Sequence, residues 1–338
     1  MSSVPQPQAA VAAPAPGERT QIMGVLNVTP DSFSDGGRWY NHADAVDHGF
    51  SLLAGGADII DVGGESTRPG AARVSEEEEL GRVVPVVREL ARDGAVISVD
   101  TMRETVARAA LDAGAAIVND VSAGQSEPGM LALAAEAGVP IILMHWRGHL
   151  GDTSVKPHYA DTVAEVAGEL EDRVRAALAQ GVSREQIVLD PGLGFSKNAR
   201  HNWDLVSRLD VFAGMGMPLL VAASRKRFLS ALVAPDPSET AALEDRDSAT
   251  AALTVLAAQA GAWAVRVHEP RSSRIAADAV HQAQLAYART AASARVREAG
   301  TRLAGSEAGT VPEAEPGPAP RGSAAERGPG AQPGDEAR

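Results

Sequence analysis

Eight short, largely apolar runs recur along the chain, and a longer segment with helical composition follows each one. The runs span residues 22–26, 59–62, 96–99, 117–118, 140–144, 187–189, 219–222 and 263–267. Their apolar character is continuous rather than alternating, which is typical of parallel strands covered on both faces. The segments between them, such as 76–92 and 162–180, are rich in Ala, Leu, Val, Glu and Arg. This alternation predicts an α/β fold built on a parallel sheet.

The number of strand–helix units narrows the choice of fold. Eight units within about 270 residues match a (β/α)8 TIM barrel in number and in size. Glycine often precedes the next strand, where helix C-caps are expected, as at Gly94, Gly138, Gly181 and Gly261. A doubly wound open sheet is the alternative, but it usually has fewer strands and a glycine-rich phosphate turn after the first one. Neither GxGxxG nor GxxxxGK[ST] stands there, so we predict the barrel, as a single domain.

The two ends of the chain have the composition of unstructured segments. Residues 1–20 are rich in Pro and Ala, and the tail from about Gly305 consists mainly of Pro, Gly, Ala and charged residues. We therefore expect a disordered extension at 1–20, the barrel at 21–292, and the end of a helix followed by a disordered tail at 293–338. The simplest interpretation of the tail is a solvated, dispensable segment, and a recruitment arm is the alternative.

Composition excludes several classes of function. The 338 residues carry a net charge of −13 and a pI near 5.1, which argues against general binding to nucleic acid or to membrane surfaces. The chain has no cysteine, so disulfides, thiolate metal ligands and a cysteine nucleophile are excluded. No apolar run approaches the roughly 20 residues of a membrane helix, and the first twenty residues lack the features of a secretory signal. We expect a cytoplasmic protein whose partners are small molecules.

Polar or charged residues follow all eight apolar runs, at the strand ends where a barrel of this class collects its chemistry. In chain order these are Asn27, segment 61–70, Asp100, Asn119, His145, Asp190, Lys226, and Arg266 with His268. Helix capping would explain any single polar residue at such a strand end, for instance Asp120. It does not explain the whole set, because lysine and arginine are not expected at N-caps. The pattern predicts an active site at this end of the barrel.

The candidate residues divide by charge. Asp100, Asn119 and Asp190 follow strands three, four and six, and their oxygens would accept from a flat heterocycle that displays several N–H groups. Strands one, two and eight become neighbours when a barrel closes. Their ends carry cationic and polar side chains suited to a pyrophosphate with Mg²⁺, namely Asn27, Thr67, Arg68, Arg266 and His268. In that arrangement Asn27 would be an oxygen ligand of the metal, and Asp35 of the first loop a second one.

Lysine is rare in this chain. Only three of the 31 basic residues are lysines, so the default cation is arginine. Lys226 lies between Arg225 and Arg227, and we interpret it as a specific choice of a compact point charge.

Several of these segments together resemble a known family. The stretches GVLNVTPDSFSDGG, DVGGESTRPGA, SVDT, VND, DPGLGF, SRKRF and RVH are similar to those of dihydropteroate synthases of folate biosynthesis, in the same order and spacing, from about Ile22 to Ala292. The first two are long and specific, whereas SVDT or RVH alone would mean little. The resemblance implies a Mg²⁺-dependent transferase that joins 6-hydroxymethyl-7,8-dihydropterin pyrophosphate to p-aminobenzoate, and a target of sulfonamides.

The resemblance also implies roles for single residues. The pterin would contact Asp100, Asn119, Val121, Met144, Asp190, Phe195, Lys226 and Arg266. The pyrophosphate would contact Asn27, Thr67, Arg68, Arg266 and His268. The p-aminobenzoate would contact Phe33, Ser34, Pro69 and Ser224. Mg²⁺ would be bound by Asn27 and Asp35, and the residues acting in catalysis would be Asn27, Arg68, Asp100, Lys226, Arg266 and His268.

Three other functions stay open at this point. One is a barrel like the corrinoid-linked methyltetrahydrofolate methyltransferases, whose chemistry does not need the two substrate loops. Another is a non-catalytic paralogue that retains the pterin site, and a third is a scaffold role of the tail. A metal hydrolase is not supported, because His145 and His268 are isolated and no HxH or HExxH accompanies them. We also expect a homodimer, formed through late barrel helices.

Overall fold

The fold is seen in a computed structural model of the chain, which describes residues 18–29, 42–65, 74–148, 158–234 and 242–307, with side chains as far as residue 291. The chain divides into two compact units, residues 1–287 and 288–338. The first unit contains the barrel. No helix among the described residues is long and apolar enough to cross a lipid bilayer.

Eight parallel strands form one sheet in the order β6-β5-β4-β3-β2-β1-β8-β7. An isolated parallel bridge between Leu189 and Leu219 joins the two outer members and brings the sheet to near closure. The bounds are β1 (Gln21–Asn27), β2 (Ile59–Gly63), β3 (Val96–Asp100), β4 (Ile117–Asp120), β5 (Ile141–Met144), β6 (Ile187–Asp190), β7 (Leu220–Val221) and β8 (Ala264–Val267). Each predicted strand is found at its place, and the predicted TIM barrel is confirmed.

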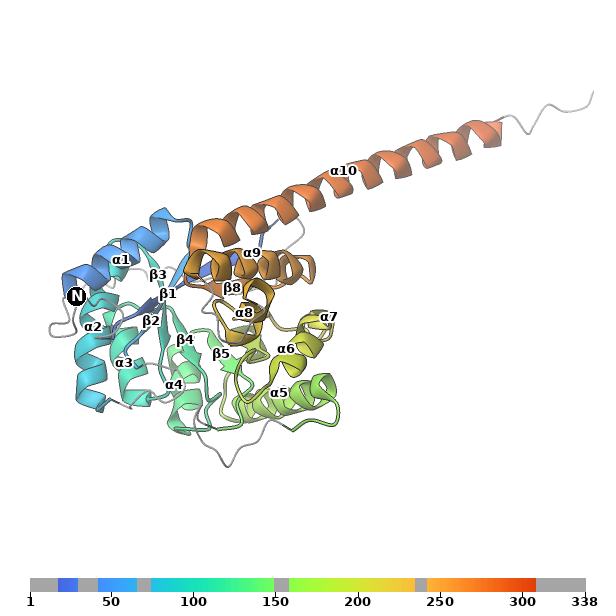
Figure 1. Cartoon of the computed structure of the whole chain (residues 1–338). Helices are drawn as coiled ribbons and strands as arrows, with labels where there is room; N and C mark the ends of the chain where they lie inside the picture. Colours follow the sequence, from blue (N-terminus) through green and yellow to red (C-terminus); the bar gives the residue numbers. More distant parts are fainter. Residues whose placement is uncertain (1–17, 30–41, 66–73, 149–157, 235–241, 308–338) are drawn as a thin grey trace, which may run out of the picture. The chain divides into compact units, whose positions relative to one another are not determined.

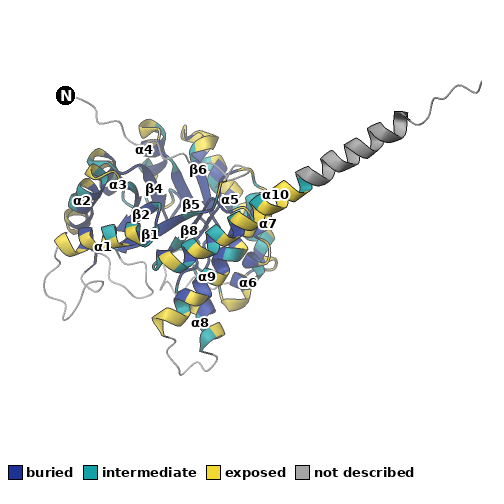
Figure 2. Ribbon diagram, turned by 90° about the horizontal axis from the view of Figure 1, so that it is seen from above, coloured by how far each residue is buried: buried dark blue, intermediate teal, exposed yellow. Residues whose placement is uncertain are grey.

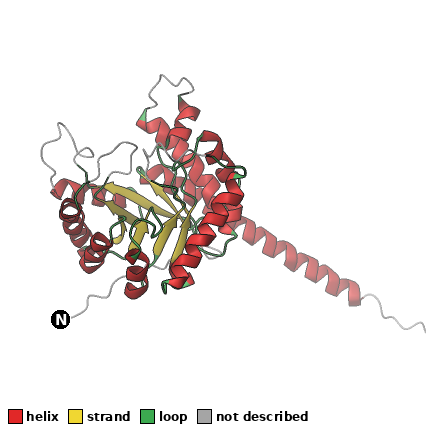
Figure 3. Cartoon of the chain, turned by 90° about the horizontal axis from the view of Figure 1, so that it is seen from below, coloured by secondary structure: helices red, strands yellow, loops and turns green. Residues whose placement is uncertain are grey.

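Helices surround the sheet, as Figures 1 and 3 show. Their bounds are α1 (His42–Ala54), α2 (Glu76–Arg92), α3 (Glu104–Ala113), α4 (Gly129–Ala137), α5 (Thr162–Ala179), the 3-10 helix η2 (Arg184–Gln186), α6 (Ala199–Val206), α7 (Leu209–Ala213), α8 (Arg227–Val233), α9 (Leu243–Gln259) and α10 (Pro270–Glu307). Capping residues account for two of these helix ends. Ser75 accepts the Glu78 N–H at the start of α2, and Gly138 ends α4 in the left-handed conformation at φ 67°.

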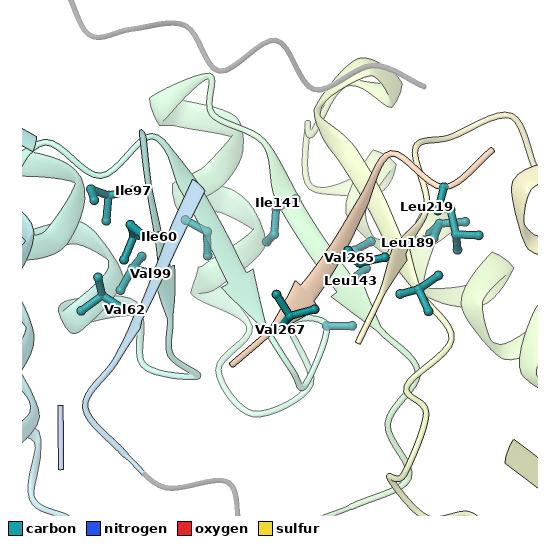
Figure 4. Packing of buried hydrophobic residues seen from close by; sticks show 14 of the residues in the cluster. Ile60, Val62, Ile97, Val99, Ile141, Leu143, Leu189, Leu219, Val265 and Val267 are labelled. Atoms are coloured by element: carbon teal, nitrogen blue, oxygen red, sulfur yellow. The ribbon is translucent and has the colours of Figure 1, made fainter. Parts of the chain in front are cut away.

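Successive residues of the strands face opposite sides of the sheet. One set packs outward against the helices in the main hydrophobic cluster, and Figure 4 shows part of it. The labelled members are Ile60, Val62, Ile97, Val99, Ile141, Leu143, Leu189, Leu219, Val265 and Val267. Both faces of each strand are therefore covered, which accounts for the continuous apolar runs, and the buried residues of Figure 2 concentrate on the strands.

The other set fills the interior of the barrel. A second buried cluster contains Met23, Ile59, Ile117, Ile142, Val188, Leu220 and Ala264, with Trp263 and Ala116. Because side chains repeat on one face every second residue, the next inward positions lie two residues further along each strand. Those positions are Val25, Asp61, Asn119, Met144, Asp190, Ala222 and Arg266. The apolar layer thus supports a layer that is largely polar, at the carboxyl ends of the strands.

Order begins slightly before the predicted start of the barrel. Arg19 pairs with Asp58, with 2.5 Å between Nη2 and Oδ1. The buried hydroxyl of Thr20 donates to the carbonyl of Ala262 over 2.8 Å. Residues 1–17 and 308–338 lie outside the described residues, so the predicted disorder of the two ends stays a prediction.

Candidate active site

Arg266 joins three strand ends inside the barrel. Its Nε donates to Oδ2 of Asp61 over 2.6 Å, and its Nη2 donates to Oδ2 of Asp100 over 2.7 Å. Burial works against the charge of the guanidinium, but Asp61 and Asp100 outweigh it and hold the pKa of Arg266 above its ordinary value. The guanidinium is thus permanently charged and fixed in orientation.

Asp100 has an unusually high pKa for an aspartate. Burial raises the pKa of its carboxyl to about 7, and although Arg266 opposes this rise, nearby Asp61 and Glu79 add to it. Asp100 lies on β3 directly beside Asn119 of β4 in the parallel register. A buried acceptor that titrates near neutral pH is a common feature of functional sites.

Asp61 is a site residue that sequence reasoning did not assign. Its side chain is fully buried, and its Oδ2 accepts from both Arg266 and the Asn119 amide, the latter over 3.0 Å. Oδ1 of the same carboxylate is buried without a hydrogen-bond partner in the described part of the chain. The sequence did contain a signal for Asp61, namely a carboxylate within an apolar strand. A buried charge requires partners, so such a residue is expected to bind other polar side chains.

The loop that follows β6 brings three predicted residues together. Oδ1 of Asp190 accepts the N–H of Gly192 over 2.7 Å. The ammonium of Lys226 donates to the carbonyl of Leu193 and lies 4.5 Å from the centroid of the Phe195 ring. Burial raises the pKa of Asp190, against the effect of Lys226. It lowers the pKa of Lys226 to about 8, against the effect of Asp190.

Two apolar residues assigned from the resemblance lie at neighbouring strand ends. Met144 is buried on β5, beside Asp190 in the parallel register. Val121 is buried directly after β4. Asp120, next to it, accepts from the N–H groups of Ser122 and Gly124 over 2.8 and 2.7 Å. Asp120 therefore caps the turn after β4 and not a helix, because α4 begins only at Gly129; its role is structural, but the helix capping considered for it is not found.

Ser224 and His268 lie in contact. The Ser224 hydroxyl oxygen is 3.0 Å from Nδ1 of His268 and accepts its backbone N–H over 3.1 Å. Arg225 has a left-handed backbone with φ 58°, and its guanidinium pairs with Asp247 of α9 through two 2.7 Å hydrogen bonds. That ion pair holds the turn. One residue assigned to p-aminobenzoate, Ser224, and one assigned to pyrophosphate, His268, thus meet after the ends of β7 and β8.

The predicted metal site is only partly within the described structure. Asn27 ends β1, where it is half-buried and pairs in register with Gly63. Asp35 lies outside the described residues, and the same holds for Phe33, Ser34, Thr67, Arg68 and Pro69. Among the side chains that the structure describes, no three His, Cys, Asp or Glu residues cluster as metal ligands.

Arginines fix the described residues on both sides of segment 66–73. Arg103 pairs with Glu65 over 3.1 Å and with the buried Glu79. Its Nη2 donates to the carbonyl of Val74 over 2.7 Å. Nη1 of Arg82 donates to the carbonyl of Gly64 over 2.8 Å. The described residues that flank this segment are therefore held to α2 and to the start of α3.

Comparison with known proteins identifies the family. The sequence model of the family described as pterin binding enzyme matches residues 23–268. The dihydropteroate synthase of Mycobacterium leprae is 52% identical over 254 residues, which are 75% of this chain and 89% of that protein. The Escherichia coli K12 enzyme of the same name is 46% identical over 253 residues, or 75% and 87% of the two chains.

Solved structures lead to the same family. A Xanthomonas albilineans dihydropteroate synthase with 4-aminobenzoic acid superposes with a TM-score of 0.72 at 41% identity, covering 80% of this chain and 94% of that one. The same enzyme in complex with 7,8-dihydropteroate gives 0.70 at 39% identity, covering 79% and 95%. The chain therefore belongs to the family of pterin-binding enzymes. Within that family its relatives are the dihydropteroate synthases, and it is a transferase as they are.

Proposed function

We propose that this chain condenses 6-hydroxymethyl-7,8-dihydropterin pyrophosphate with p-aminobenzoate, giving 7,8-dihydropteroate and pyrophosphate. The observation that carries the proposal is the fixed cation at the strand ends: Arg266 is held by Asp61 and Asp100, next to Asn119. Carboxylate and amide oxygens suit the N–H edge of a pterin, and a permanent guanidinium suits a departing pyrophosphate. The ligands named for the Xanthomonas albilineans structures, 4-aminobenzoic acid and 7,8-dihydropteroate, fit this reaction.

The proposed mechanism is dissociative. The C–O bond to pyrophosphate breaks first, and the methylene cation that forms is delocalised into the pterin ring. Arg266 and His268 stabilise the negative charge that develops on the leaving group, while Asp100 and Asp190 support the electron-poor ring. The neutral aniline nitrogen then attacks and loses its proton to water or pyrophosphate, so no strong general base is needed.

The proposed Mg²⁺ would neutralise charge on the pyrophosphate. Mg²⁺ is commonly held by one or two protein oxygens together with substrate phosphates and water. Within the described structure, the Asn27 amide is the one proposed oxygen ligand, which suits a metal held mainly by the substrate. Asp35 is the second proposed ligand. In this chain Asn27 would orient the metal–pyrophosphate group toward Arg266 and His268.

The decisive experiment measures pyrophosphate release, with mass detection of dihydropteroate. Purified protein receives both substrates, with Mg²⁺ or with EDTA. We expect product with Mg²⁺ and a loss of it with EDTA, whereas equal rates in both would contradict metal dependence. Slow pyrophosphate release without p-aminobenzoate is expected if C–O cleavage precedes attack. Tight pterin binding without turnover would favour the non-catalytic paralogue, and methyl transfer from methyltetrahydrofolate would favour the methyltransferase alternative.

We also propose that the protein is a cytoplasmic homodimer. Large apolar side chains are exposed on α9 and α10, including Leu256 at 45% and Ile275 at 62% of their surface. Burial of such groups between two subunits is favourable. Sedimentation of the wild type and of Ile275→Glu tests the dimer: we expect a dimer in the first and more monomer in the second. A monomeric wild type would contradict the proposal.

A further inference from the structure

Lys197 crosslinks two strand ends behind the proposed pterin site. Its Nζ donates to the carbonyls of Gly192 and Phe195, each over 3.0 Å, and lies 2.9 Å from Nδ1 of His145. Gly192 and Phe195 belong to the loop after β6, whereas His145 directly follows β5. One ammonium thus contacts three groups, two on the loop and one on the neighbouring strand end.

The loop held by Lys197 is the one that assembles part of the site. It supplies Phe195, the Gly192 N–H that binds Asp190, and the Leu193 carbonyl that accepts from Lys226. Its backbone is left-handed at Gly192 and Gly194, with φ of 66° and 80°. Such a turn directs carbonyls inward, and buried carbonyls need donors. Lys197 provides the donor for two of them.

Glu169 of α5 and Arg147 hold His145, the partner of Lys197 on the β5 side, in place. His145 is buried, and its Nε2 is 2.9 Å from Oε2 of Glu169 on α5. Nε of Arg147 donates to the same carboxylate over 3.0 and 3.1 Å. Hydrogen bonds with His145 and Arg147 hold the pKa of Glu169 well below its ordinary value, and an ionised carboxylate can only accept. Nε2 of His145 therefore carries the proton, and Nδ1 of the neutral ring accepts from Lys197, whose own pKa burial lowers to about 7. Burial lowers the pKa of His145 to about 4, against the effect of Glu169, which agrees with a neutral ring.

The choice of lysine is specific. Two of the three lysines in the chain, Lys197 and Lys226, act on this one loop, although arginine supplies nearly all other cations. The ammonium group of lysine is compact and carries three N–H donors, one for each of the two carbonyls and the imidazole. A guanidinium is planar and larger, so we do not expect it to replace the ammonium at this buried position.

We propose that Lys197 is a positioning residue for the pterin substrate. By holding the loop to the end of β5 it keeps Asp190, Phe195 and Lys226 in the arrangement that meets the pterin, without itself touching the substrate. This inference deepens the proposed function and rests on it. It predicts an effect on the pterin substrate that is not shared by p-aminobenzoate.

Steady-state kinetics of Lys197→Met and Lys197→Arg test the inference in the full-length protein. We expect the KM for the pterin pyrophosphate to rise about tenfold or more in both, because misplacement of binding groups weakens the substrate complex, while the KM for p-aminobenzoate stays near its wild-type value. An unchanged pterin KM in Lys197→Met, or equal rises in both KM values, would overturn the inference. An inactive wild type that does not bind the pterin would instead contradict the proposed function.

Two further measurements do not depend on the folding of a Lys197 variant, and the first of them does not depend on activity. Nitrogen NMR of the wild type, with the signal assigned by its loss in His145→Gln, should show the proton of His145 on Nε2; a proton on Nδ1 would overturn the inference. His145→Gln and His145→Leu form a matched pair, because Gln both accepts and donates and Leu does neither. We expect a raised pterin KM in His145→Leu and a nearly normal one in His145→Gln; equal values in the two would overturn it.

Discussion

Nε of Arg266 donates to Oδ2 of Asp61 over 2.6 Å, although 205 positions separate the two residues in the chain. The contact spans the place where β1 lies between β2 and β8. Oδ2 of Asp61 also accepts from Asn119, so one carboxylate oxygen orients two proposed ligands of the pterin. Asp61 and Arg266 depend on each other: without Arg266 the buried Asp61 would lose its cationic partner, and without Asp61 the guanidinium would be held by Asp100 alone.

Asp61→Asn should therefore impair turnover although no substrate contact is proposed for Asp61 itself. The amide keeps the size of the carboxylate but loses its charge, so Arg266 is held less firmly. We expect kcat/KM to fall about 10²-fold, as for a displaced charge donor. Asp210→Asn is the matched control, because Asp210 is exposed and pairs with Arg208 over 2.9 Å. A normal rate in Asp61→Asn, with melting temperatures matched, would show that Asp61 is dispensable.

The pH profile of kcat/KM for the pterin substrate should be bell-shaped. Because the pKa of Asp100 is raised to about 7, its carboxyl is neutral below that pH and no longer pairs with Arg266. Because the pKa of Lys226 is lowered to about 8, its ammonium loses the proton above that pH. Activity should thus rise through about pH 7 and fall above about pH 8. Asp100→Asn should lack the acid limb, and an acid limb that persists in it would refute the assignment to Asp100.

His145 should contribute to stability in a pH-dependent way. Its pKa is lowered from 6.5 to about 4 by burial, so the unfolded chain binds a proton that the folded one does not between these values. The contribution is present above about pH 6.5 and is lost as pH falls toward 4. Between pH 7.5 and 5 we expect the wild type to lose about 2 kcal/mol more than His145→Gln. Urea unfolding at both pH values measures this, and parallel losses would contradict it.

Gly192 should not tolerate a side chain. A Cβ there would lie 2.4 Å from the carbonyl oxygen of His145, at a backbone φ of 66°. Gly94 is the matched control, because its φ is 91° but a Cβ at that position would meet nothing within 4 Å. We expect Gly94→Ala to cost about 1 kcal/mol through backbone strain alone, and Gly192→Ala about 3 kcal/mol or more through strain and overlap together. Equal costs in denaturant unfolding would refute the steric argument.

Much of this architecture could be read from local pattern. The apolar runs predict all eight strands, and helix α2 has the predicted bounds of Glu76–Arg92. The location of the site could also be predicted from the sequence, because barrels of this fold place their active sites at the carboxyl ends of the strands. The strand order confirms that β1 lies between β2 and β8, as a closed barrel requires. These features depend on periodicities of a few residues, which the sequence displays directly.

The partners of individual side chains are a different matter. The sequence determined that Asp61, Asp100, Asn119 and Arg266 occur at strand ends, and family motifs pointed to most of their roles. Only the tertiary structure decided that Asp61 binds both Arg266 and Asn119, and that Lys197 joins the loop after β6 to His145. A side chain finds its partner through strand register and barrel closure. Both depend on contacts between distant segments, which no local pattern records.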